Sequence, residues 1–362
     1  MAAGLAGCAG GRAGAPRPRA QASLAPVRPR SQRILILGGT GFVGPALVQA
    51  ARARGHVITL FNRGKTNPTL FADVETILGD RRTDIDRLRG RDWDAVIDTW
   101  VNLPRTVRTA AELLRDHVGH YLFLSTISVY QLGRDPIDEG SPVLRLADEK
   151  SEKFDLTTYG PLKALAERAA EEAMPGRATA VRAGVIVGPG DPSDRFIYWP
   201  LRLARGGEVL APGAPGDRMT FIDHRDLADW MILAVEQRLT GVYNVVGPEQ
   251  PELGAVLDAC TTGVGGEARL TWVDSRWLEA QGAGGWEDFP LAVRRDSEEA
   301  GFARVSAARA IATGLRFRSP AVTARDSLAW WNALPAERRN RPRPGLRPER
   351  EAELLARWKS AR

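Results

Sequence analysis

Short apolar runs of strand length alternate along much of the chain with stretches whose apolar residues recur at helical spacing. The runs predict β-strands at residues 34–37, 57–61, 121–124, 220–222 and 242–246. The helical spacing predicts helices at residues 46–54, 201–205, 226–237, 253–262, 275–281, 322–333 and 347–357. Strands that alternate with helices are typical of parallel sheets. We therefore expect an α/β fold with a Rossmann-type, doubly wound parallel sheet, followed by a smaller, mostly helical C-terminal lobe.

A glycine turn joins the first predicted strand to the first predicted helix. The turn contains Gly38, Gly41, Phe42, Val43 and Gly44. Glycines let backbone N–H groups approach a pyrophosphate closely, and the start of the following helix supplies partial positive charge. A glycine triplet alone is weak evidence, so an ordinary tight turn is the alternative. Its place between a strand and a helix favours a dinucleotide-binding site.

Basic residues follow the second predicted strand. Asn62 lies 18 residues beyond Gly44, near the position from which such folds contact the adenine ribose, and Arg63 and Lys65 come directly after it. A carboxylate here would repel a 2′-phosphate, whereas a guanidinium can bind one. The pattern favours NADP as the cofactor, with NAD as the second choice. The alternative is a solvated basic turn.

Tyr159 and Lys163 are four residues apart, so on a helix their side chains share one face. An ammonium group close to a tyrosine favours the phenolate and lowers the pKa of the tyrosine from its ordinary value near ~10. The pair therefore predicts acid/base chemistry on a carbinol or a carbonyl. Upstream, the strand at 121–124 leads into hydroxyl-bearing residues at 125–130 that are placed to bind a substrate oxygen.

Three segments in this order resemble the extended short-chain dehydrogenase/reductases, also called the NAD-dependent epimerase/dehydratase family. They are GGTGFVG at 38–44, STISVY at 125–130 and YGPLK at 159–163, and the resemblance extends over roughly residues 33–330. It implies a Rossmann domain that binds a nicotinamide dinucleotide and a smaller lobe that closes over the substrate.

The resemblance also assigns roles to individual residues. Tyr159 matches the catalytic acid/base, and Lys163 matches the residue that binds the nicotinamide ribose and tunes the tyrosine. Thr126 matches the hydroxyl that orients the reacting oxygen, with Ser125 and Ser128 as weaker matches. Asp80 falls where the family often contacts adenine.

Two positions depart from the family's patterns. Nucleotide-sugar 4,6-dehydratases carry an acidic pair directly after the catalytic threonine, whereas this chain has Ile127 and Ser128, so we expect no elimination of water. Sugar-nucleotide epimerases place an arginine near position 218 to bind the diphosphate, but Arg218 is one residue out of step. The substrate is therefore not identified by the sequence.

Charge is distributed unevenly along the 362 residues. The net charge is +6 and the isoelectric point is about 9.7. Residues 1–33 contain six arginines and no acidic residue, and residues 337–362 contain nine Lys or Arg against four Glu, which leaves residues 34–336 mildly acidic. Nucleic acid is therefore an unlikely partner. The four histidines lack metal-ligand spacing, and no apolar run is long enough to span a membrane.

The expected domain organisation has four parts. Residues 1–32 form a disordered arm rich in Ala, Gly, Pro and Arg, residues 33–190 the cofactor-binding domain, residues 191–335 the substrate lobe, and residues 336–362 a basic tail with a helix. The chain as given indicates a cytoplasmic protein. Cys8 ends a sequence similar to a lipoprotein cleavage box, so an upstream start would indicate a periplasmic or lipid-anchored protein.

The most probable chemistry is reversible hydride transfer between NADP and a secondary alcohol or ketone of a small molecule. A nucleotide-sugar epimerase with bound cofactor is the alternative, and a non-catalytic member that binds RNA or protein is a third reading. We expect a monomer or a homodimer and no metal.

Overall fold

The computed structural model describes residues 1, 30–99, 103–131, 133–248, 251–341 and 343–361. Residues 31–362 form one compact unit, separate from residues 1–30. The unit begins two residues before the expected boundary because Ser31 Oγ donates a hydrogen bond to Gly55 O and Gln32 N donates one to His56 Nδ1. The predicted arm, with Cys8, otherwise lies outside the described residues.

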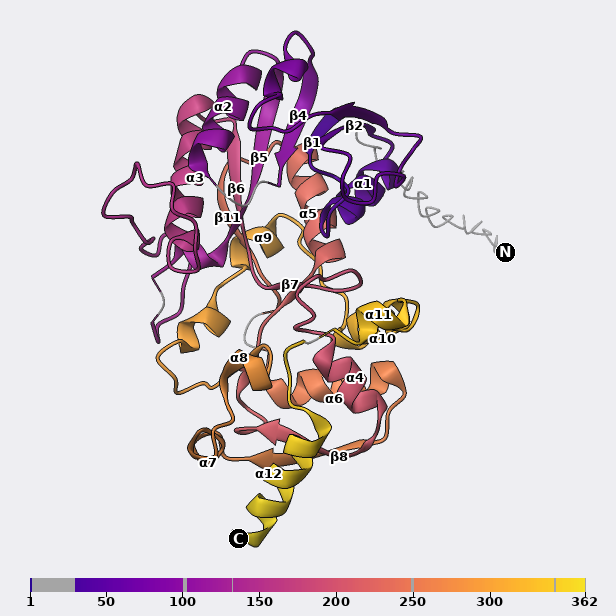
Figure 1. Ribbon diagram of the computed structural model, residues 1–362. Helices are drawn as coiled ribbons and strands as arrows, with labels where there is room; N and C mark the ends of the chain where they lie inside the picture. The colour runs from indigo at the N-terminus through magenta and orange to yellow at the C-terminus, as the bar shows by residue number, and fades with distance from the viewer. Residues whose placement is uncertain (2–29, 100–102, 132, 249–250, 342, 362) are drawn as a thin grey trace. The chain divides into compact units, whose positions relative to one another are not determined.

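A seven-stranded parallel sheet forms the centre of this unit (Figure 1). Its strands are β1 (Arg33–Leu37), β2 (Val57–Asn62), β3 (Glu75–Leu78), β4 (Trp93–Asp98), β5 (Val118–Thr126), β6 (Ala178–Ala183) and β11 (Gly241–Val245). The spatial order is β11-β6-β5-β4-β1-β2-β3. From β1 the sheet continues through β2 to β3 on one side. On the other side it continues from β4 through β5 and β6 to β11. Ligands of doubly wound sheets bind where the order reverses, which here is directly after β1.

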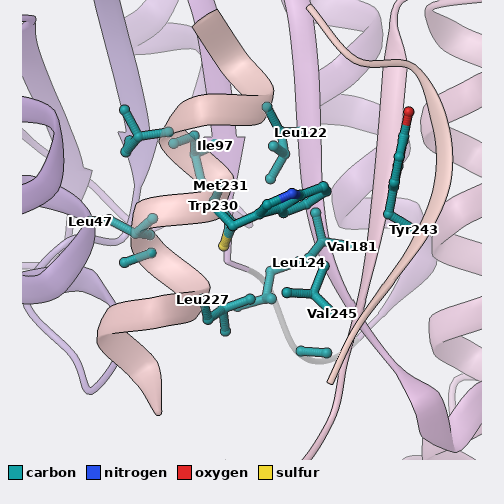
Figure 2. Packing of buried hydrophobic residues seen from close by; sticks show 14 of the residues in the cluster. Leu47, Ile97, Leu122, Leu124, Val181, Leu227, Trp230, Met231, Tyr243 and Val245 are labelled. Carbon is teal, nitrogen blue, oxygen red and sulfur yellow. The ribbon is translucent and has the colours of Figure 1, made fainter. Parts of the chain in front are cut away.

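Helices cover both faces of the sheet, which confirms the predicted fold class. Helices α1 (Gly44–Ala53) and α5 (His224–Gln237) pack on one face, and α2 (Pro104–Leu114) and α3 (Tyr159–Ala173) pack on the other. Figure 2 shows the first face, where Leu227, Trp230 and Met231 of α5 contact the strand residues Leu122 and Val181. Burial of such side chains stabilises the fold by roughly 1.5–3 kcal/mol each.

The smaller lobe has its own apolar core and holds more strand than expected. Its helices are α4 (Tyr198–Ala204), α6 (Leu253–Val264), α7 (Ser275–Ala280), α8 (Gly285–Asp288), α10 (Pro320–Asn332) and α12 (Pro348–Ser360). Its strands are the parallel pair β8 (Gly207–Pro212) and β12 (Ala268–Val273) and the antiparallel pair β9 (Arg218–Met219) and β13 (Ala292–Val293). β12 contains Arg269 and Thr271 and is buried only at Val273, and the buried part of β8 is only four residues long, so both sequences carry a weak strand signal.

Several shorter elements complete the described fold. They are β7 (Ile186–Val187), β10 (Ile222–Asp223), α9 (Ala308–Ala312), α11 (Ala336–Arg339) and the 3₁₀ turns at Ile85–Leu88, Ile127–Val129 and Ala300–Arg304. Of the strand predicted at 220–222, only Ile222 lies in a strand, because residues 220 and 221 separate β9, which pairs with β13, from β10, which pairs with β7.

Helix α12 is fixed to the smaller lobe by a buried carboxylate. Glu351 Oε2 accepts a hydrogen bond from Arg202 Nε over 2.6 Å, and Glu351 Oε1 accepts one from Leu210 N over 2.9 Å. The predicted basic tail thus contributes an ion pair to the interior. Among the described helices, none is long and apolar enough to cross a membrane.

Candidate active site

The glycine turn lies directly after β1, at the reversal of the strand order. Gly38 and Gly39 adopt the left-handed backbone region, with φ of 128° and 98°. A Cβ atom on Gly39 would lie 2.5 Å from Leu60 Cδ2, so the backbone and its surroundings both require glycine. Gly39 was not among the predicted residues, although its place beside Gly38 was a signal for it.

The turn leads into α1 and leaves space beside the start of that helix. Val43 is the residue before the helix, Phe42 precedes it, and Gly44 packs against the backbone of Gly39. Gly41 is exposed, and a Cβ atom placed on it would meet no described atom within 4 Å. Open space beside the free N–H groups of a helix start fits a pyrophosphate. The predicted glycine-turn residues therefore form a cradle of the kind that a dinucleotide requires.

Two asparagine side chains tie the loop after β2 to the glycine turn. Asn62 Nδ2 donates to Gly38 O over 3.2 Å, and Asn67 Nδ2 donates to Thr40 O over 2.9 Å. The predicted residues Arg63 and Lys65 lie between these asparagines, and both are exposed. The basic side chains are thus held at the edge of the glycine turn.

Asp80 follows β3, the strand next to β2. Its carboxylate accepts hydrogen bonds from Arg82 Nε over 3.2 Å and from Arg82 Nη2 over 3.1 Å. The hydrogen bonds from Arg82 and the charges of Arg82 and Arg63 lower the pKa of Asp80 to about 2. The carboxylate is ionised but paired, so it repels a nearby phosphate less than a free carboxylate would.

Thr126 and Tyr159 meet where β5 ends and α3 begins. Thr126 Oγ1 accepts a hydrogen bond from Ser128 N over 3.1 Å, and a side-chain hydrogen bond joins Thr126 to Tyr159. Burial raises the pKa of Tyr159, while the hydrogen bond to Thr126 and the charge of Arg195 act in the opposite direction. Thr126 Oγ1 also donates to Ser128 Oγ over 3.2 Å, and Thr126 and Tyr159 both line one cavity, so the two predicted hydroxyl groups lie close together.

Gly160 sets the distance between these two elements. A Cβ atom on Gly160 would lie 2.0 Å from Ser128 O, so any larger residue would push α3 away from the end of β5. Only a glycine next to Tyr159 allows the first turn of α3 to pack so closely. Sequence reasoning assigned no role to this glycine.

Lys163 is fully enclosed on the same face of α3 and is oriented by β5. Its ammonium group donates a hydrogen bond to Leu124 O over 2.5 Å and lies 4.1 Å from the centroid of the Phe123 ring. Burial lowers the pKa of Lys163 to about 7. The structure differs here from the sequence-based expectation of a lowered tyrosine pKa, because the ammonium contacts the backbone and burial dominates at Tyr159.

Ser125, the weaker hydroxyl match, is committed to a buried ion pair. Its hydroxyl donates to Glu167, and Glu167 Oε2 accepts a hydrogen bond from Arg182 Nη2 over 2.8 Å. Ser128 is half-buried and borders the cavity described next. Thr126 is therefore the hydroxyl of the three that contacts Tyr159.

A cavity of about 790 Å³ opens beside Thr126 and Tyr159. Phe42 of the glycine turn borders it on one side, and Trp286 and Phe289 of the smaller lobe border it on the other. The cavity therefore extends from Phe42 past Thr126 and Tyr159 to the smaller lobe, whereas Lys163 is enclosed and does not line it. Its size suits a small molecule.

Arg195 enters this cavity from the segment that follows β7. Arg195 Nε donates to Ser193 Oγ over 2.9 Å, and Ser193 Oγ donates to Asp191 Oδ1 over 2.7 Å. Its positive charge lowers the pKa of Tyr159 against the effect of burial. Sequence reasoning took this segment only as a loop over the site.

The backbone before Arg195 is held in place from outside the cavity. Asp194 has a φ of 55°, which is unfavourable for a residue with a side chain. Arg338 holds it through two hydrogen bonds of 2.7 Å, one to each carboxylate oxygen. The pairing partner lies 144 residues away in the sequence, so no local pattern predicts it.

The residues that depart from the family's patterns differ in their position relative to the cavity. Ile127 and Ser128 both line the cavity, whereas Arg218 lies outside its lining and is 3.7 Å from Glu252. Among the described residues, no group of three or more His, Cys, Asp or Glu is arranged to hold a metal ion.

Comparisons with known proteins identify the family of the chain. The model of the NAD dependent epimerase/dehydratase family matches residues 34–246. The epimerase family protein SDR39U1 of Bos taurus is 30% identical over 234 residues, which are 60% of this chain and 74% of that protein.

Solved structures share the fold at lower identity. Human epimerase family protein SDR39U1 (isoform 2), solved with NADPH, has a TM-score of 0.53 and 23% identity over 83% of this chain and 100% of that chain. WbmG of Bordetella bronchiseptica, solved with NAD and UDP, has a TM-score of 0.60 and 20% identity over 85% of this chain and 96% of that chain. The UDP-Glc/GlcNAc 4-epimerase of Campylobacter jejuni has a TM-score of 0.60 and 15% identity over 83% of this chain and 99% of that chain.

Proposed function

Because the chain belongs to the NAD dependent epimerase/dehydratase family, we propose that it is an NAD(P)-dependent oxidoreductase. The reaction is reversible hydride transfer between the nicotinamide and a secondary alcohol or ketone of a small molecule. The observation that carries this proposal is that Tyr159 and Thr126 line a cavity that also reaches Phe42 of the glycine turn. Proton transfer and cofactor binding thereby have adjacent sites.

Each residue of the site has a proposed task. Tyr159 gives or takes the proton of the reacting hydroxyl, and Thr126 orients that hydroxyl through a second hydrogen bond. Arg195 stabilises the phenolate form of Tyr159, because a nearby positive charge favours the ionised tyrosine. The resemblance to the family assigns the nicotinamide ribose to Lys163, although the structure encloses its side chain and keeps it out of the cavity lining. The bound dinucleotide supplies or accepts the hydride.

NADP is the proposed cofactor. The cradle after β1 fits a pyrophosphate, since Gly41 leaves open space at the start of α1. Arg63 and Lys65 are exposed beside it and carry the charge that a 2′-phosphate requires. Arg82 pairs with Asp80, which reduces the repulsion that this carboxylate would exert on the phosphate. The relative solved with NADPH is in accord with this choice.

A nucleotide-sugar epimerase is the second candidate. It is favoured by WbmG, which was solved with NAD and UDP. The contact of Arg218 with Glu252 speaks against it, because an arginine that binds a diphosphate should face the cavity. An RNA- or protein-binding role is less favoured, since a binder has no need of the contact between Tyr159 and Thr126.

The cofactor of the purified protein separates the first two candidates. We expect an empty site that binds added NADPH reversibly, as a reductase requires. The measurement is mass spectrometry of the denatured protein. Tightly bound dinucleotide in stoichiometric amount would favour the epimerase instead.

Catalysis is tested with Tyr159→Phe, which removes only the proton-carrying hydroxyl. Turnover of a substrate found by screening secondary alcohols and ketones should fall at least ~10²-fold while the NADPH dissociation constant stays the same. Thr126→Val should lower turnover without changing cofactor binding. Lys163→Met should weaken both. Parent-like turnover by Tyr159→Phe would refute the assignment.

A further inference from the structure

An ion pair is buried behind the candidate catalytic lysine. Asp98 ends β4 and is 0% exposed, and Arg81 is 8% exposed. Arg81 Nη2 donates to Asp98 Oδ2 over 2.7 Å, Arg81 Nη1 donates to Asp98 Oδ1, and Tyr121 Oη donates to Asp98 Oδ2 over 2.5 Å. Removing two charges from water costs several kcal/mol. Two apolar side chains of similar volume would fill this place at a lower cost in free energy. The presence of two buried charges therefore indicates a function.

The strand register places Asp98 next to Lys163. Asp98 of β4 pairs with Phe123 of β5, and the Lys163 ammonium lies 4.1 Å from the Phe123 ring. Neighbouring strands are about 4.8 Å apart. Tyr121 is two residues before Phe123, so its side chain lies on the same face of the sheet. The side chains of Asp98 and Lys163 therefore lie on the same face of the sheet, at neighbouring strands, in the interior between the sheet and α3.

Four charged or titratable groups surround the lysine. Burial is the largest influence and lowers the pKa of Lys163, while the charge of Asp98, followed by that of Glu167 on α3, raises it. Arg81 lowers it, and Tyr121 stays neutral because burial raises its own pKa well above the usual range. Both carboxylates are paired with an arginine, Asp98 with Arg81 and Glu167 with Arg182. Asp98 is the acid with the strongest effect on the ammonium.

We propose that Asp98 is a positioning residue for Lys163: its carboxylate, fixed by Arg81 and Tyr121, is the buried counter-charge that keeps the lysine protonated beside Leu124. Arg81 and Tyr121 use three hydrogen bonds to hold Asp98 ionised and in one orientation. The proposal rests on the role of Lys163 in the proposed function for its importance. The protonation of Lys163 itself can be measured without cofactor or substrate.

The sequence makes a direct measurement practical. The chain contains five lysines, and Lys65, Lys150, Lys153 and Lys359 are exposed while Lys163 is buried. Protein labelled with ¹³C-lysine should give one Cε signal with an unusual titration midpoint, and its loss in Lys163→Met would assign it. Asp98→Asn should lower that midpoint by about one pH unit or more, because an opposite charge nearby shifts a pKa by roughly 1–3 units. A parent-like midpoint in folded Asp98→Asn would overturn the proposal.

Two further variants separate charge from packing. Tyr121→Phe keeps the carboxylate and its pairing with Arg81, so the Lys163 midpoint should stay within a few tenths of a unit. The double variant Arg81→Met/Asp98→Asn removes both charges and avoids leaving a lone buried guanidinium. Its midpoint should lie between those of the parent and Asp98→Asn. If Asp98→Asn does not fold, the double variant decides: a midpoint at or above that of the parent would overturn the proposal.

NADPH binding provides a separate test of the proposed role of Lys163. If Lys163 holds the nicotinamide ribose, the NADPH dissociation constant should rise with pH through the lysine midpoint, and Asp98→Asn should show that rise at lower pH. A shifted lysine midpoint without any change in NADPH binding would support the role of Asp98 and refute the proposed role of Lys163.

Discussion

Asn67 donates its side-chain N–H to the carbonyl of Thr40 over 2.9 Å and so joins the loop after β2 to the glycine turn. Asn67 has a φ of 44°, a backbone region that asparagine and glycine tolerate better than other residues. The loop that carries Arg63 and Lys65 therefore keeps a fixed position beside the proposed pyrophosphate site.

Removing this hydrogen bond should weaken cofactor binding. A neutral hydrogen bond contributes about 1 kcal/mol, so Asn67→Gly should raise the NADPH dissociation constant about fivefold with little strain. Asn67→Ala should show the same weakening and also lose about 1 kcal/mol of folding stability because of its positive φ. Fluorescence titration and urea unfolding measure the two effects. Unchanged affinity in both variants would show that the loop position is irrelevant.

Arg63 should decide between the two dinucleotides. We expect NADPH to bind at least tenfold more tightly than NADH, a difference of ~1.4 kcal/mol. Arg63→Asp should reverse the order, because a carboxylate repels the 2′-phosphate and accepts hydrogen bonds from ribose hydroxyls. Arg63→Ala should give similar affinities for both. Equal affinities in the parent protein would contradict the preference for NADP.

Asp226 should make the stability of the fold depend on pH. Burial raises the pKa of Asp226 to about 6, although Arg318 donates to its carboxylate. The folded protein therefore holds this proton more tightly than the unfolded chain, whose aspartate titrates near ~4. The stabilising contribution is fully present below pH 4 and is lost as the pH rises through 6.

Asp226→Asn cannot ionise and should lose this part of the pH dependence. The free energy of unfolding of the parent, relative to that of Asp226→Asn, should fall by roughly 3 kcal/mol between pH 4 and pH 7. Asp258→Asn is the control, since Asp258 is exposed on α6 and is not among the groups that influence Asp226. Parallel stability curves for the parent and Asp226→Asn would show that Asp226 titrates normally.

No dehydration of nucleotide sugars should occur. Dehydration needs an acid for the leaving hydroxyl and a base for the neighbouring C–H proton. Ile127 and Ser128 line the cavity at the positions where the related dehydratases carry two carboxylates, and neither can supply this chemistry. Incubation with nucleotide hexoses, followed by mass spectrometry for a product lighter by one water, is the assay. A 4-keto-6-deoxy product formed at enzymatic rates would refute the exclusion.

The sequence predicted the cofactor side of the protein better than the substrate side. The glycine turn and the sheet follow from local patterns, because strand, turn and helix are consecutive in the chain. Arg195 depends on Asp194 and Arg338, which are 144 residues apart and have no sequence signal in common. The position of Lys163 is also only partly predictable from the sequence. Its spacing from Tyr159 predicts a shared helix face, but its orientation comes from Leu124 O on a strand 39 residues earlier.

The buried contact of Glu351 with Arg202 has a consequence for the order in which the protein forms during translation. Arg202 leaves the ribosome 149 residues before Glu351. The strands of the large sheet are all synthesised by residue 245. Until Glu351 has been synthesised, the guanidinium of Arg202 has no carboxylate partner. Burial of a lone charge is strongly unfavourable. The nascent sheet can therefore form while the smaller lobe stays open, and the cavity between them matures only when the last helix has emerged.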